Sequence, residues 1–211
     1  MVRELEARAD ASDAAARQWL GALSGPEREG VMAQMRGDPA KFYGGVAKDL
    51  FLAVSPQTRR LLYALARTSH ARHVVEFGTS FGVSTLFLAA AVRDNGGGRV
   101  ITCEFEPGKA ATARQTFQRA GVADLIELRE GDALATLATG LPDQLDLVLL
   151  DGAKPLYPAL FSLLAPRLRP GALVVADNAD DSPEYLALVR GDRRVVSVAW
   201  SDEVEITCAA A

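Results

Sequence analysis

The chain has 211 residues, of which 49% are hydrophobic and 24% charged, and this is enough apolar material for the core of one α/β domain. Its formal net charge of −4 disfavours a nucleic-acid partner and leaves a small molecule as the better expectation. The charged start "MVRELEARAD" is unlike a signal peptide, and Gly, Pro or Asp interrupts every long apolar run. We therefore expect a cytoplasmic protein without a membrane span.

Helical periodicity dominates the first part of the chain. It is clearest in "DAAARQWLGAL" (13–23) and in "SPQTRRLLYALAR" (55–67), where Ser55 has the character of an N-cap and Pro56 that of a first helical residue. We expect residues 1–70 to form a helical brace or lid. Residues 71–211 then form the α/β core of the same single domain.

Short aliphatic runs alternate with helical patterns through the core. Near-continuous apolar strands of this kind are typical of a buried parallel sheet with helices on both faces. The final runs, 193–200 and 205–211, flank the turn-like "SDEV" and predict an antiparallel hairpin at the edge of the sheet. The predicted parallel strands cover residues 73–77, 99–105, 125–130, 145–151 and 171–177.

The cysteines, histidines and large aromatic residues favour structural roles. Cys103 and Cys208 lie in strand-like contexts, so we expect two buried thiols and no disulfide. No zinc-binding spacing occurs, and His70 and His73 only flank a strand. Tyr157 and Trp200 are placed to be core or pocket residues, and we favour the core.

The first predicted strand leads into a glycine turn that is a candidate ligand site. In "VVEFGTSFGVSTLFLAAA" (74–91), Glu76 precedes Gly78 and Gly82, and a helix follows at once. Glycines allow a backbone to approach a ligand, and a helix N-terminus offers unpaired N–H groups. The spacing G-x-x-x-G differs from the dinucleotide fingerprint G-x-G-x-x-G, which favours another ligand.

Acids end the other predicted strands as well. Ligands of open α/β sheets bind at the carboxyl ends of the strands, where these acids would gather. Glu104 is placed to accept hydrogen bonds from both hydroxyls of a ribose, although it could also be a solvated strand end. The acids and the neighbouring amide are Glu104, Asp132, Asp151, Asp177 and Asn178.

Four separated blocks of sequence carry a family resemblance. They are "VVEFGTSFGVSTLFLA", "ITCEFEPGKAATARQTFQRAGVADLIELREGDAL", "LDLVLLDGAKPLYPALF" and "RPGALVVADN". In order and spacing, over roughly residues 54–178, the chain resembles the class I S-adenosylmethionine-dependent O-methyltransferases of the catechol and caffeoyl-CoA group. The resemblance implies a Rossmann-like fold with a seven-stranded sheet in the order 3-2-1-4-5-7-6, strand 7 antiparallel, helices on both faces and extra N-terminal helices.

The resemblance also implies a binding site for S-adenosylmethionine. In the family, the first-strand acid and glycine turn hold the methionine part, the next strand's acid grips the ribose, and a later Asp-Ala pair lies beside the adenine. A glycine turn suits a zwitterion because its N–H groups meet the carboxylate while an acid meets the ammonium. The matching residues are Val54, Ser55, Glu76, Gly78, Gly82, Ser84, Glu104, Asp132, Ala133 and Asp151.

A divalent-metal site is the second implication of the resemblance. Asp151, Asp177 and Asn178 match the family's metal ligands, and three oxygen donors leave room for substrate oxygens as Mg²⁺ prefers. Lys154 matches the lysine to which the family gives the role of base, and with Asp151 it forms the predicted catalytic pair. Only 4 of the 23 basic residues are lysines, and lysine can lose a proton where arginine cannot. Alternatively, Lys154 only neutralises nearby acids, and the "ADN" motif is an Asx turn.

We therefore expect an O-methyltransferase that uses S-adenosylmethionine and Mg²⁺ or another divalent cation to methylate a small molecule with vicinal hydroxyls. The family also suggests a homodimer. Two alternatives remain, a methyltransferase of hydroxylated tRNA uridine, which would need a basic surface, and a cofactor-binding module that has lost catalysis.

The stretch after Asn178, "ADDSPEYLALVRGD", is short and acidic, so no wall for an aromatic ring is identified. Two roles are open for Asp180, Asp181, Glu184 and Tyr185, contact with the substrate or the capping and solvation of a short helix that begins near Ser182 and Pro183, and we favour the second.

Overall fold

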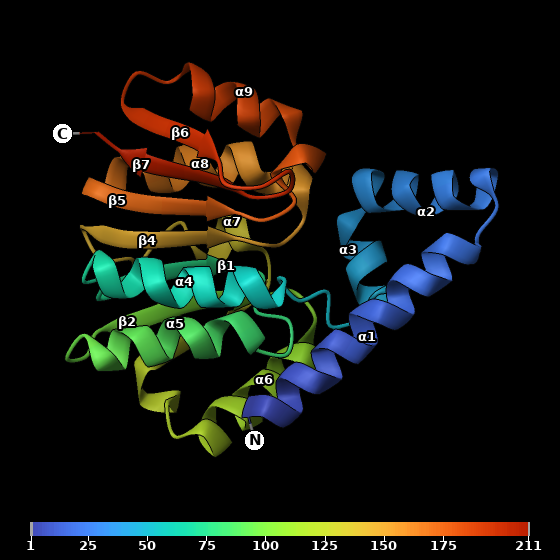
Figure 1. The fold of residues 1–211 in the computed structure, drawn as a ribbon, viewed down its shortest axis with the longest axis horizontal. Helices are drawn as coiled ribbons and strands as arrows, with labels where there is room; N and C mark the ends of the chain where they lie inside the picture. The colour runs from blue at the N-terminus through green and yellow to red at the C-terminus, as the bar shows by residue number, and fades with distance from the viewer. Residues whose placement is uncertain (1, 211) are drawn as a thin grey trace.

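The computed structural model describes the backbone of residues 2–210 and their side chains except those of Arg36 and Ala40. Met1 and Ala211, the ends of the predicted single domain, lie outside the described residues. One sheet has the order β3-β2-β1-β4-β5-β7-β6, parallel from β3 to β5 and antiparallel on both sides of β7 (Figure 1). The predicted strand order is therefore confirmed. The strands are β1 (His73–Phe77), β2 (Arg99–Glu104), β3 (Ile126–Glu130), β4 (Leu145–Leu150), β5 (Leu168–Ala176), β6 (Val195–Ala199) and β7 (Glu205–Ala209).

Helices cover both faces of the sheet. One face carries α4 (Pro56–Thr68), α5 (Val83–Asp94) and α6 (Pro107–Ala120), and the other carries α7 (Ala133–Thr136), α8 (Tyr157–Leu164) and α9 (Pro183–Gly191). Figure 1 shows α4 and α5 in front of the sheet and α8 behind it. Short helical turns complete the connections, namely η2 (Ala123–Leu125), η3 (Lys154–Leu156), η4 (Ala165–Arg167) and η5 (Ala179–Asp181).

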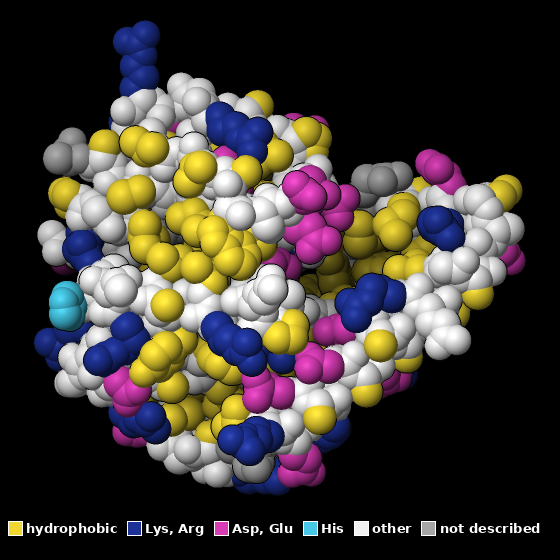
Figure 2. All heavy atoms as spheres, viewed as in Figure 1, with side chains coloured by type: hydrophobic (Ala, Val, Ile, Leu, Met, Phe, Trp, Pro, Cys, Tyr) yellow, Lys and Arg dark blue, Asp and Glu magenta, His cyan; other side chains and the backbone are white. Residues whose placement is uncertain are grey.

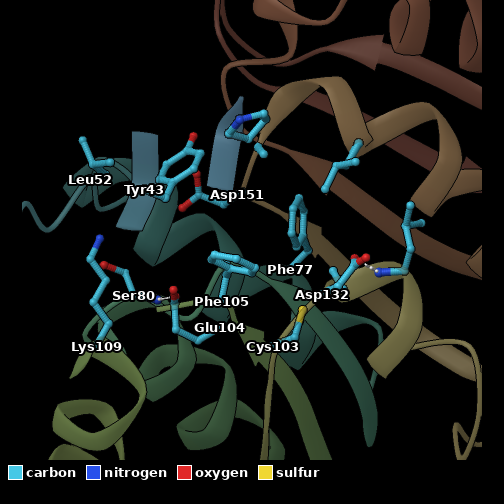
Figure 3. A pocket seen from close by; sticks show the side chains of 18 residues that line it. Tyr43, Leu52, Phe77, Ser80, Cys103, Glu104, Phe105, Lys109, Asp132 and Asp151 are labelled. Atoms are coloured by element: carbon cyan, nitrogen blue, oxygen red, sulfur yellow. Dashed lines mark hydrogen bonds between the residues drawn. The ribbon is translucent and has the colours of Figure 1, made fainter. Parts of the chain in front are cut away.

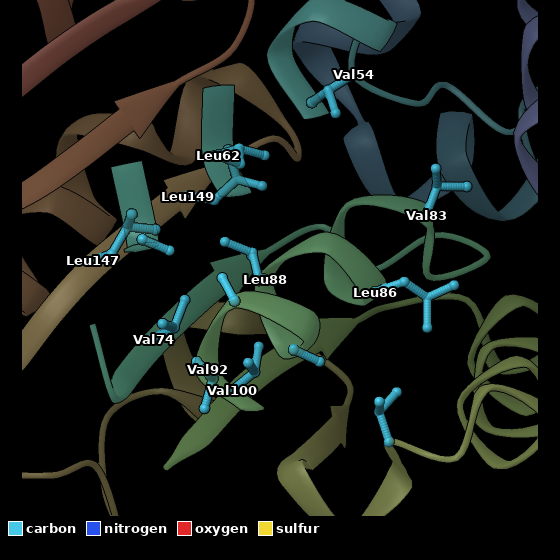
Figure 4. Close-up of a cluster of buried hydrophobic side chains, with 14 of the residues drawn as sticks. Val54, Leu62, Val74, Val83, Leu86, Leu88, Val92, Val100, Leu147 and Leu149 are labelled. Carbon is cyan, nitrogen blue, oxygen red and sulfur yellow. The ribbon is translucent and has the colours of Figure 1, made fainter. Parts of the chain in front are cut away.

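The sheet has a hydrophobic core on each of its two faces, because successive side chains of a strand point to opposite faces. On β4, Leu147 and Leu149 belong to the core beneath α4 and α5, whereas Val148 and Leu150 belong to the core beneath α8. Figure 4 shows the first of these cores. Each fully buried aliphatic side chain stabilises the fold by about 1.5–3 kcal/mol. The continuous apolar strands of the sequence thus reflect burial on both faces.

The N-terminal brace consists of α1 (Val2–Ala22), α2 (Gly25–Gly37), α3 (Pro39–Lys41) and a π-helical turn η1 (Phe42–Val46). Leu5 and Ala9 of α1 enter the core beside α5, while α2 projects away from the sheet (Figure 1). Residues 47–55, which we call the strap, lead back to α4. The buried side chain of Arg59 donates from Nε to the Val54 carbonyl at 2.9 Å and from Nη2 to Asp10 at 2.9 Å, so it ties strap, α1 and α4 together.

The C-terminal hairpin of β6 and β7 closes the sheet as predicted, but Trp200 does not lie in the core. Its side chain is 43% exposed, and Val196 and Val198 are 68% and 59% exposed. Val196, Val198 and Trp200 alternate along the chain with Val195, which packs against the core beneath α8 and α9, so they belong to the opposite face of the hairpin. Figure 2 shows hydrophobic side chains gathered on that face. The expectation for Trp200 was wrong because no helix in the described part of the chain covers it.

The remaining structural expectations concern thiols and membrane spans. Both cysteines are free thiols as predicted, and Cys103 is buried, but Cys208 is only half-buried. Tyr157 is fully buried, and α9 begins at Pro183 after Ser182, both as expected. The expectation that Tyr185 helps to solvate this helix was wrong, because its side chain is fully buried and its ring packs against those of Tyr157 and Phe161. Across residues 2–210, no helix has both the length and the apolar character needed to cross a bilayer.

Candidate active site

A cavity of about 300 Å³ opens where the carboxyl ends of β1, β2 and β4 meet the brace (Figure 3). Several predicted site residues line it, namely Gly78, Glu104, Asp132, Ala133 and Asp151. The brace contributes Tyr43 and the strap contributes Leu52. The cavity therefore joins the sheet edge that sequence reasoning identified to N-terminal residues that it did not identify.

Gly78 makes the approach of the β1 and β4 ends possible. Its φ is +102°, and a Cβ atom at this position would lie 2.2 Å from the backbone oxygen of Asp151. The N–H groups of Gly78 and Thr79 both donate to the Cys103 carbonyl, at 3.2 and 3.1 Å. The turn is thus fixed against β2 and β4, and only glycine fits its first position.

Glu104 presents an oriented carboxylate to the cavity. Its Oε2 accepts the Ser80 N–H at 2.7 Å and its Oε1 accepts the Glu106 N–H at 2.9 Å. The side chain is only 9% exposed. Each oxygen keeps a free lone pair, so the pair of oxygens can accept two further hydrogen bonds from a ligand in the cavity.

An apolar slot continues from Glu104 towards α7. Phe105, Leu134 and Ala133 line it together with the thiol of Cys103. Asp132 is the N-cap of α7, since its carboxylate accepts the Leu134 N–H at 2.9 Å. Burial raises the pKa of Cys103 to about 12, so this thiol stays protonated. A flat aromatic group would suit this end of the cavity.

Glu76 lies behind the cavity in a buried network of hydroxyls. Its carboxylate accepts from Ser84 at 2.6 Å, from Thr85 at 2.5 Å and from Thr102 at 2.6 Å. Burial raises the pKa of Glu76, and the three hydroxyl donors oppose the shift. These contacts join the end of β1 to the start of α5 and to β2, so Glu76 and Ser84 position the glycine turn in this structure.

Three other predicted residues also lie outside the lining of the cavity. Ser55 caps α4 by accepting the Thr58 N–H at 3.0 Å, Val54 is buried in the core beside α4, and the helix α5 begins after Gly82. A Cβ atom at Gly82 would lie 2.5 Å from the ring of Phe117. For these three, as for Glu76 and Ser84, direct contact with a cofactor stays a prediction.

Asp151 and Lys154 form an ion pair at the end of β4. Lys154 Nζ lies 3.4 Å from Asp151 Oδ1, and the two side chains are 10% and 8% exposed. Burial raises the pKa of Asp151, Lys154 opposes the shift, and the nearby carboxylates of Asp177 and Glu76 add to it. Burial and the neighbouring carboxylates thus disfavour the ionised form of Asp151, whereas Lys154 favours it.

Asp177 and Asn178 follow β5 next to this pair. The Tyr157 hydroxyl lies 2.8 Å from the Leu150 carbonyl and 2.9 Å from that of Asp177, which joins the ends of β4 and β5. Burial raises the pKa of Asp177, and Lys154 opposes the shift.

Within the described part of the chain, no three His, Cys, Asp or Glu side chains could hold a metal ion. An ion here would need the amide oxygen of Asn178 as its third protein ligand. Lys154, Asp177 and Asn178 do not line the cavity itself.

Sequence reasoning missed Tyr43, Leu52, Ser80 and Lys109. Tyr43 reaches the cavity from η1, and burial and the nearby charge of Asp151 raise its pKa. The Ser80 hydroxyl donates to the Phe51 carbonyl of the strap at 2.6 Å, and both Leu52 and Ser80 have positive φ, 48° and 47°. Lysine is rare in this chain, and that signal, which we applied to Lys154, would also have singled out Lys109.

A family model described as a methyltransferase domain matches residues 75–179. This range runs from β1 to η5 and includes the ends of β1 to β5. All of the predicted cofactor and metal residues except Val54 and Ser55 lie within it. The match thus covers about half of the chain, and this half forms the edge of the sheet at which strands β1 to β5 end.

Curated relatives resemble the same part of the chain. Catechol O-methyltransferase of Niastella koreensis is 35% identical over 130 residues, which are 60% of this chain and 58% of that protein. Catechol O-methyltransferase of Mycobacterium tuberculosis is 42% identical over 127 residues, 60% of this chain and 57% of that protein. The matched region thus spans less than two thirds of either relative. Catechol O-methyltransferase B of Danio rerio is 30% identical over 185 residues, 82% of this chain and 69% of that protein.

Solved structures share the fold. The O-methyltransferase TomG from Streptomyces achromogenes, in complex with S-adenosylmethionine, matches with a TM-score of 0.68 and 28% identity over 84% of this chain and 90% of that one. An O-methyltransferase from Bacillus cereus in complex with S-adenosylhomocysteine has a TM-score of 0.72 at 24% identity over 93% and 97% of the two chains, a likeness of fold alone. Three findings agree, namely the order of the sheet, the match to the methyltransferase domain and the 30% identity to the Danio rerio protein, 69% of which is matched by this chain. The chain therefore belongs to the class I O-methyltransferases of the catechol O-methyltransferase type.

Proposed function

We propose that the chain transfers a methyl group from S-adenosylmethionine to one of two adjacent hydroxyls of a small molecule, with the help of a divalent cation. The observation that carries the proposal is that Glu104 and Asp151 face one cavity of about 300 Å³ from the ends of β2 and β4, the two strands that flank β1. This volume lies within the range of small-molecule sites. The names of the relatives, catechol O-methyltransferases, support the acceptor class.

The residues present fit the cofactor. Glu104 offers two oriented acceptor positions for the ribose, and the glycine turn at Gly78 brings its backbone to the cavity where a Cβ atom could not fit. Phe105 and Ala133 offer an apolar slot for the adenine. Glu104 would therefore hold the ribose of S-adenosylmethionine, and Phe105 and Ala133 would hold its adenine.

The catalytic pair would be Lys154 and Asp151. When bound, S-adenosylmethionine supplies a methyl group on a positively charged sulfur, and a divalent cation lowers the pKa of an acceptor hydroxyl. Lys154, in its neutral form, would accept the proton of that hydroxyl, and Asp151 would orient Lys154 through their 3.4 Å contact. Tyr43 would cover the acceptor side and exclude water.

The donor set at the ends of β4 and β5 suits a hard divalent cation. Asp151 and Asp177 supply carboxylates, Asn178 supplies an amide oxygen, and Mg²⁺ prefers oxygen ligands. Asp151 and Asp177 both lie near one ammonium, that of Lys154. When both carboxylates are ionised, a divalent cation would balance the remaining negative charge. We assign these three side chains as the protein ligands.

We also propose that the chain forms a homodimer through its N-terminal helices. Trp19 of α1 is 41% exposed, and α1 and α2 extend away from the sheet (Figure 1). Hydrophobic side chains line the hollow beside α2 (Figure 2). Sedimentation velocity checks this, since a dimer is expected for the natural chain and a monomer for Trp19→Asp.

A transfer assay with matched acceptors tests the proposed activity. Methyl transfer is expected to a catechol, to be much slower with the corresponding monophenol, and to be undetectable with tRNA. Excess chelator should abolish the reaction and added Mg²⁺ should restore it, and Asp177→Ala should reproduce the chelated state. Full activity in excess chelator would remove the metal from the proposal, and cofactor binding without transfer to any diol would indicate a binding module.

A further inference from the structure

Lys109 is a buried lysine that the proposed reaction does not use. It belongs to the first turn of α6, its side chain is 4% exposed, and it lines the same cavity as Glu104. Figure 3 shows Lys109, Ser80 and Glu104 on one side of the cavity. Among the described residues that line the cavity, Lys109 is the only lysine or arginine.

The ammonium of Lys109 has unused hydrogen-bond donors. In residues 2–210, no carboxylate oxygen lies within the 4.0 Å of an ion pair and no acceptor within hydrogen-bonding distance of its Nζ. Its named contact is the ring of Phe81, whose centre is 5.5 Å away. The Nζ atom keeps accessible surface although the residue is largely buried, so its donors open to the cavity, where an oxygen of a ligand can accept from them.

Several carboxylates act on the charge of Lys109. Burial lowers the pKa of Lys109, and Glu104 opposes this most among the neighbouring acids, followed by Glu106, Asp49 and Asp13. These acids favour the charged form of Lys109 from beyond ion-pair distance. What it lacks is a short contact with an acceptor, and a neutral hydroxyl oxygen supplies such a contact without adding another negative charge.

One short connection holds Glu104 and Lys109 in fixed positions relative to each other. Glu106 caps α6 by accepting the Lys109 N–H at 2.6 Å, while its own N–H donates to Glu104 at 2.9 Å. The end of β2 and the start of α6 are thus fixed to each other through Glu106. A ligand group held by Glu104 would meet the side chain of Lys109 in a defined geometry.

A ribose hydroxyl matches both side chains at once. Each hydroxyl donates one hydrogen bond, for which Glu104 is the acceptor, and its oxygen keeps lone pairs that can accept. We propose that Lys109 is a second ribose-binding residue, whose ammonium donates to a ribose hydroxyl of S-adenosylmethionine while Glu104 accepts the proton of that hydroxyl. This inference rests on the proposed function, because it presupposes that this cofactor occupies the cavity.

Calorimetric titration with S-adenosylhomocysteine and its 2′-deoxy and 3′-deoxy analogues tests the assignment. Lys109→Met keeps the length of the side chain and removes its donors. A hydrogen bond to a charged group is worth roughly 1.5–3 kcal/mol, so the variant should bind S-adenosylhomocysteine at least about tenfold more weakly. Its affinity for the analogue that lacks the contacted hydroxyl should fall less than about twofold. Lys109→Gln, which retains a neutral donor, should lie between the two and serves if Lys109→Met does not fold.

The exposed Lys48 of the strap provides the matched control, and Lys48→Met should leave all three dissociation constants unchanged. Equal weakening of all three ligands by Lys109→Met would overturn the assignment, because the lost contact would then not involve a ribose hydroxyl. Unchanged affinity for S-adenosylhomocysteine would overturn it as well. If the natural chain binds none of the three ligands, the proposed function itself falls.

Discussion

Glu104 owes its orientation to backbone groups, and this makes it the residue whose loss is easiest to interpret. Its two oxygens already accept the N–H groups of Ser80 and Glu106, so their remaining lone pairs have fixed directions. Glu104→Ala should therefore weaken the binding of S-adenosylmethionine by roughly 1.5–3 kcal/mol for each hydrogen bond to the ribose, which is at least about tenfold overall. Calorimetric titration measures the change.

Glu130 provides the control for this prediction. It pairs with Glu104 in the register of β2 and β3, but its side chain is 43% exposed and forms an ion pair with Arg114. Glu130→Ala should leave the affinity for the cofactor unchanged. Equal dissociation constants for Glu104→Ala and the natural chain would remove Glu104 from the binding site.

For Lys154, the question is whether catalysis depends on its positive charge or on its ability to accept a proton. Lys154→Arg keeps a cation beside Asp151 but cannot accept a proton at neutral pH. We expect the variant to lose most of its kcat, about 10²-fold or more, while its affinity for the cofactor stays close to that of the natural chain. Steady-state rates at saturating acceptor measure this. Should arginine sustain the same kcat, Lys154 would be an electrostatic partner and the base would lie elsewhere.

At the scale of elements, the turn between β1 and α5 depends on Gly78 for two separable reasons. Gly78 and Gly97 have similar φ values, +102° and +97°, but only at Gly78 would a Cβ atom overlap a neighbour, the Asp151 oxygen at 2.2 Å. Gly97→Ala should cost about 1–2 kcal/mol from backbone strain alone. Gly78→Ala should cost about 3 kcal/mol or more, since the β4 end must also move. Urea unfolding of both variants measures the difference, and equal costs would show that the close approach is unimportant.

The contact between α9 and β7 predicts how stability changes with pH. Glu205 accepts two hydrogen bonds from Arg190, at 2.9 and 2.7 Å, and one from Ser197, and the bond with Arg190 lowers the pKa of Glu205 most. A carboxylate whose pKa is lowered by folding stabilises the protein above its unfolded pKa of about 4.3, and this contribution is lost as the pH falls through the folded pKa.

Glu205→Gln removes that contribution. The free energy of unfolding should fall by about 1–3 kcal/mol at pH 7, and the difference from the natural chain should shrink at pH values near 3. Urea unfolding at both pH values measures this. Asp202→Asn, in the exposed turn of the hairpin, should show no such dependence on pH. A deficit for Glu205→Gln that is as large at pH 3 as at pH 7 would contradict the account.

For the whole molecule, the sequence predicted the sheet well because its strands are buried on both faces. The run 147–150 is apolar at every position and all of β4 is buried, a pattern typical of a central strand in a covered sheet. The order of the strands came from the family resemblance and is confirmed. Trp200 was misjudged because its strand pattern resembles that of a covered strand, whereas its face of the hairpin has no helix over it.

The cavity was predicted only on its sheet side. Strand ends can be located from sequence, and Glu104 ends β2 while Gly78 and Asp151 directly follow β1 and β4. Tyr43 and Leu52 reach the cavity because the brace folds back over the sheet, and that contact is set by packing of α1 and by Arg59. Such long-range contacts carry no local signal in the sequence.

The central claim is that this cavity transfers a methyl group to a diol. The most direct measurement is mass spectrometry of the product formed from a catechol, Mg²⁺ and S-adenosylmethionine with a deuterated methyl group. The account predicts a product that carries one deuterated methyl group on one of its two oxygens, and no such product from the Asp177→Ala variant. Absence of any labelled product, while calorimetry shows that the natural chain binds S-adenosylmethionine, would contradict it.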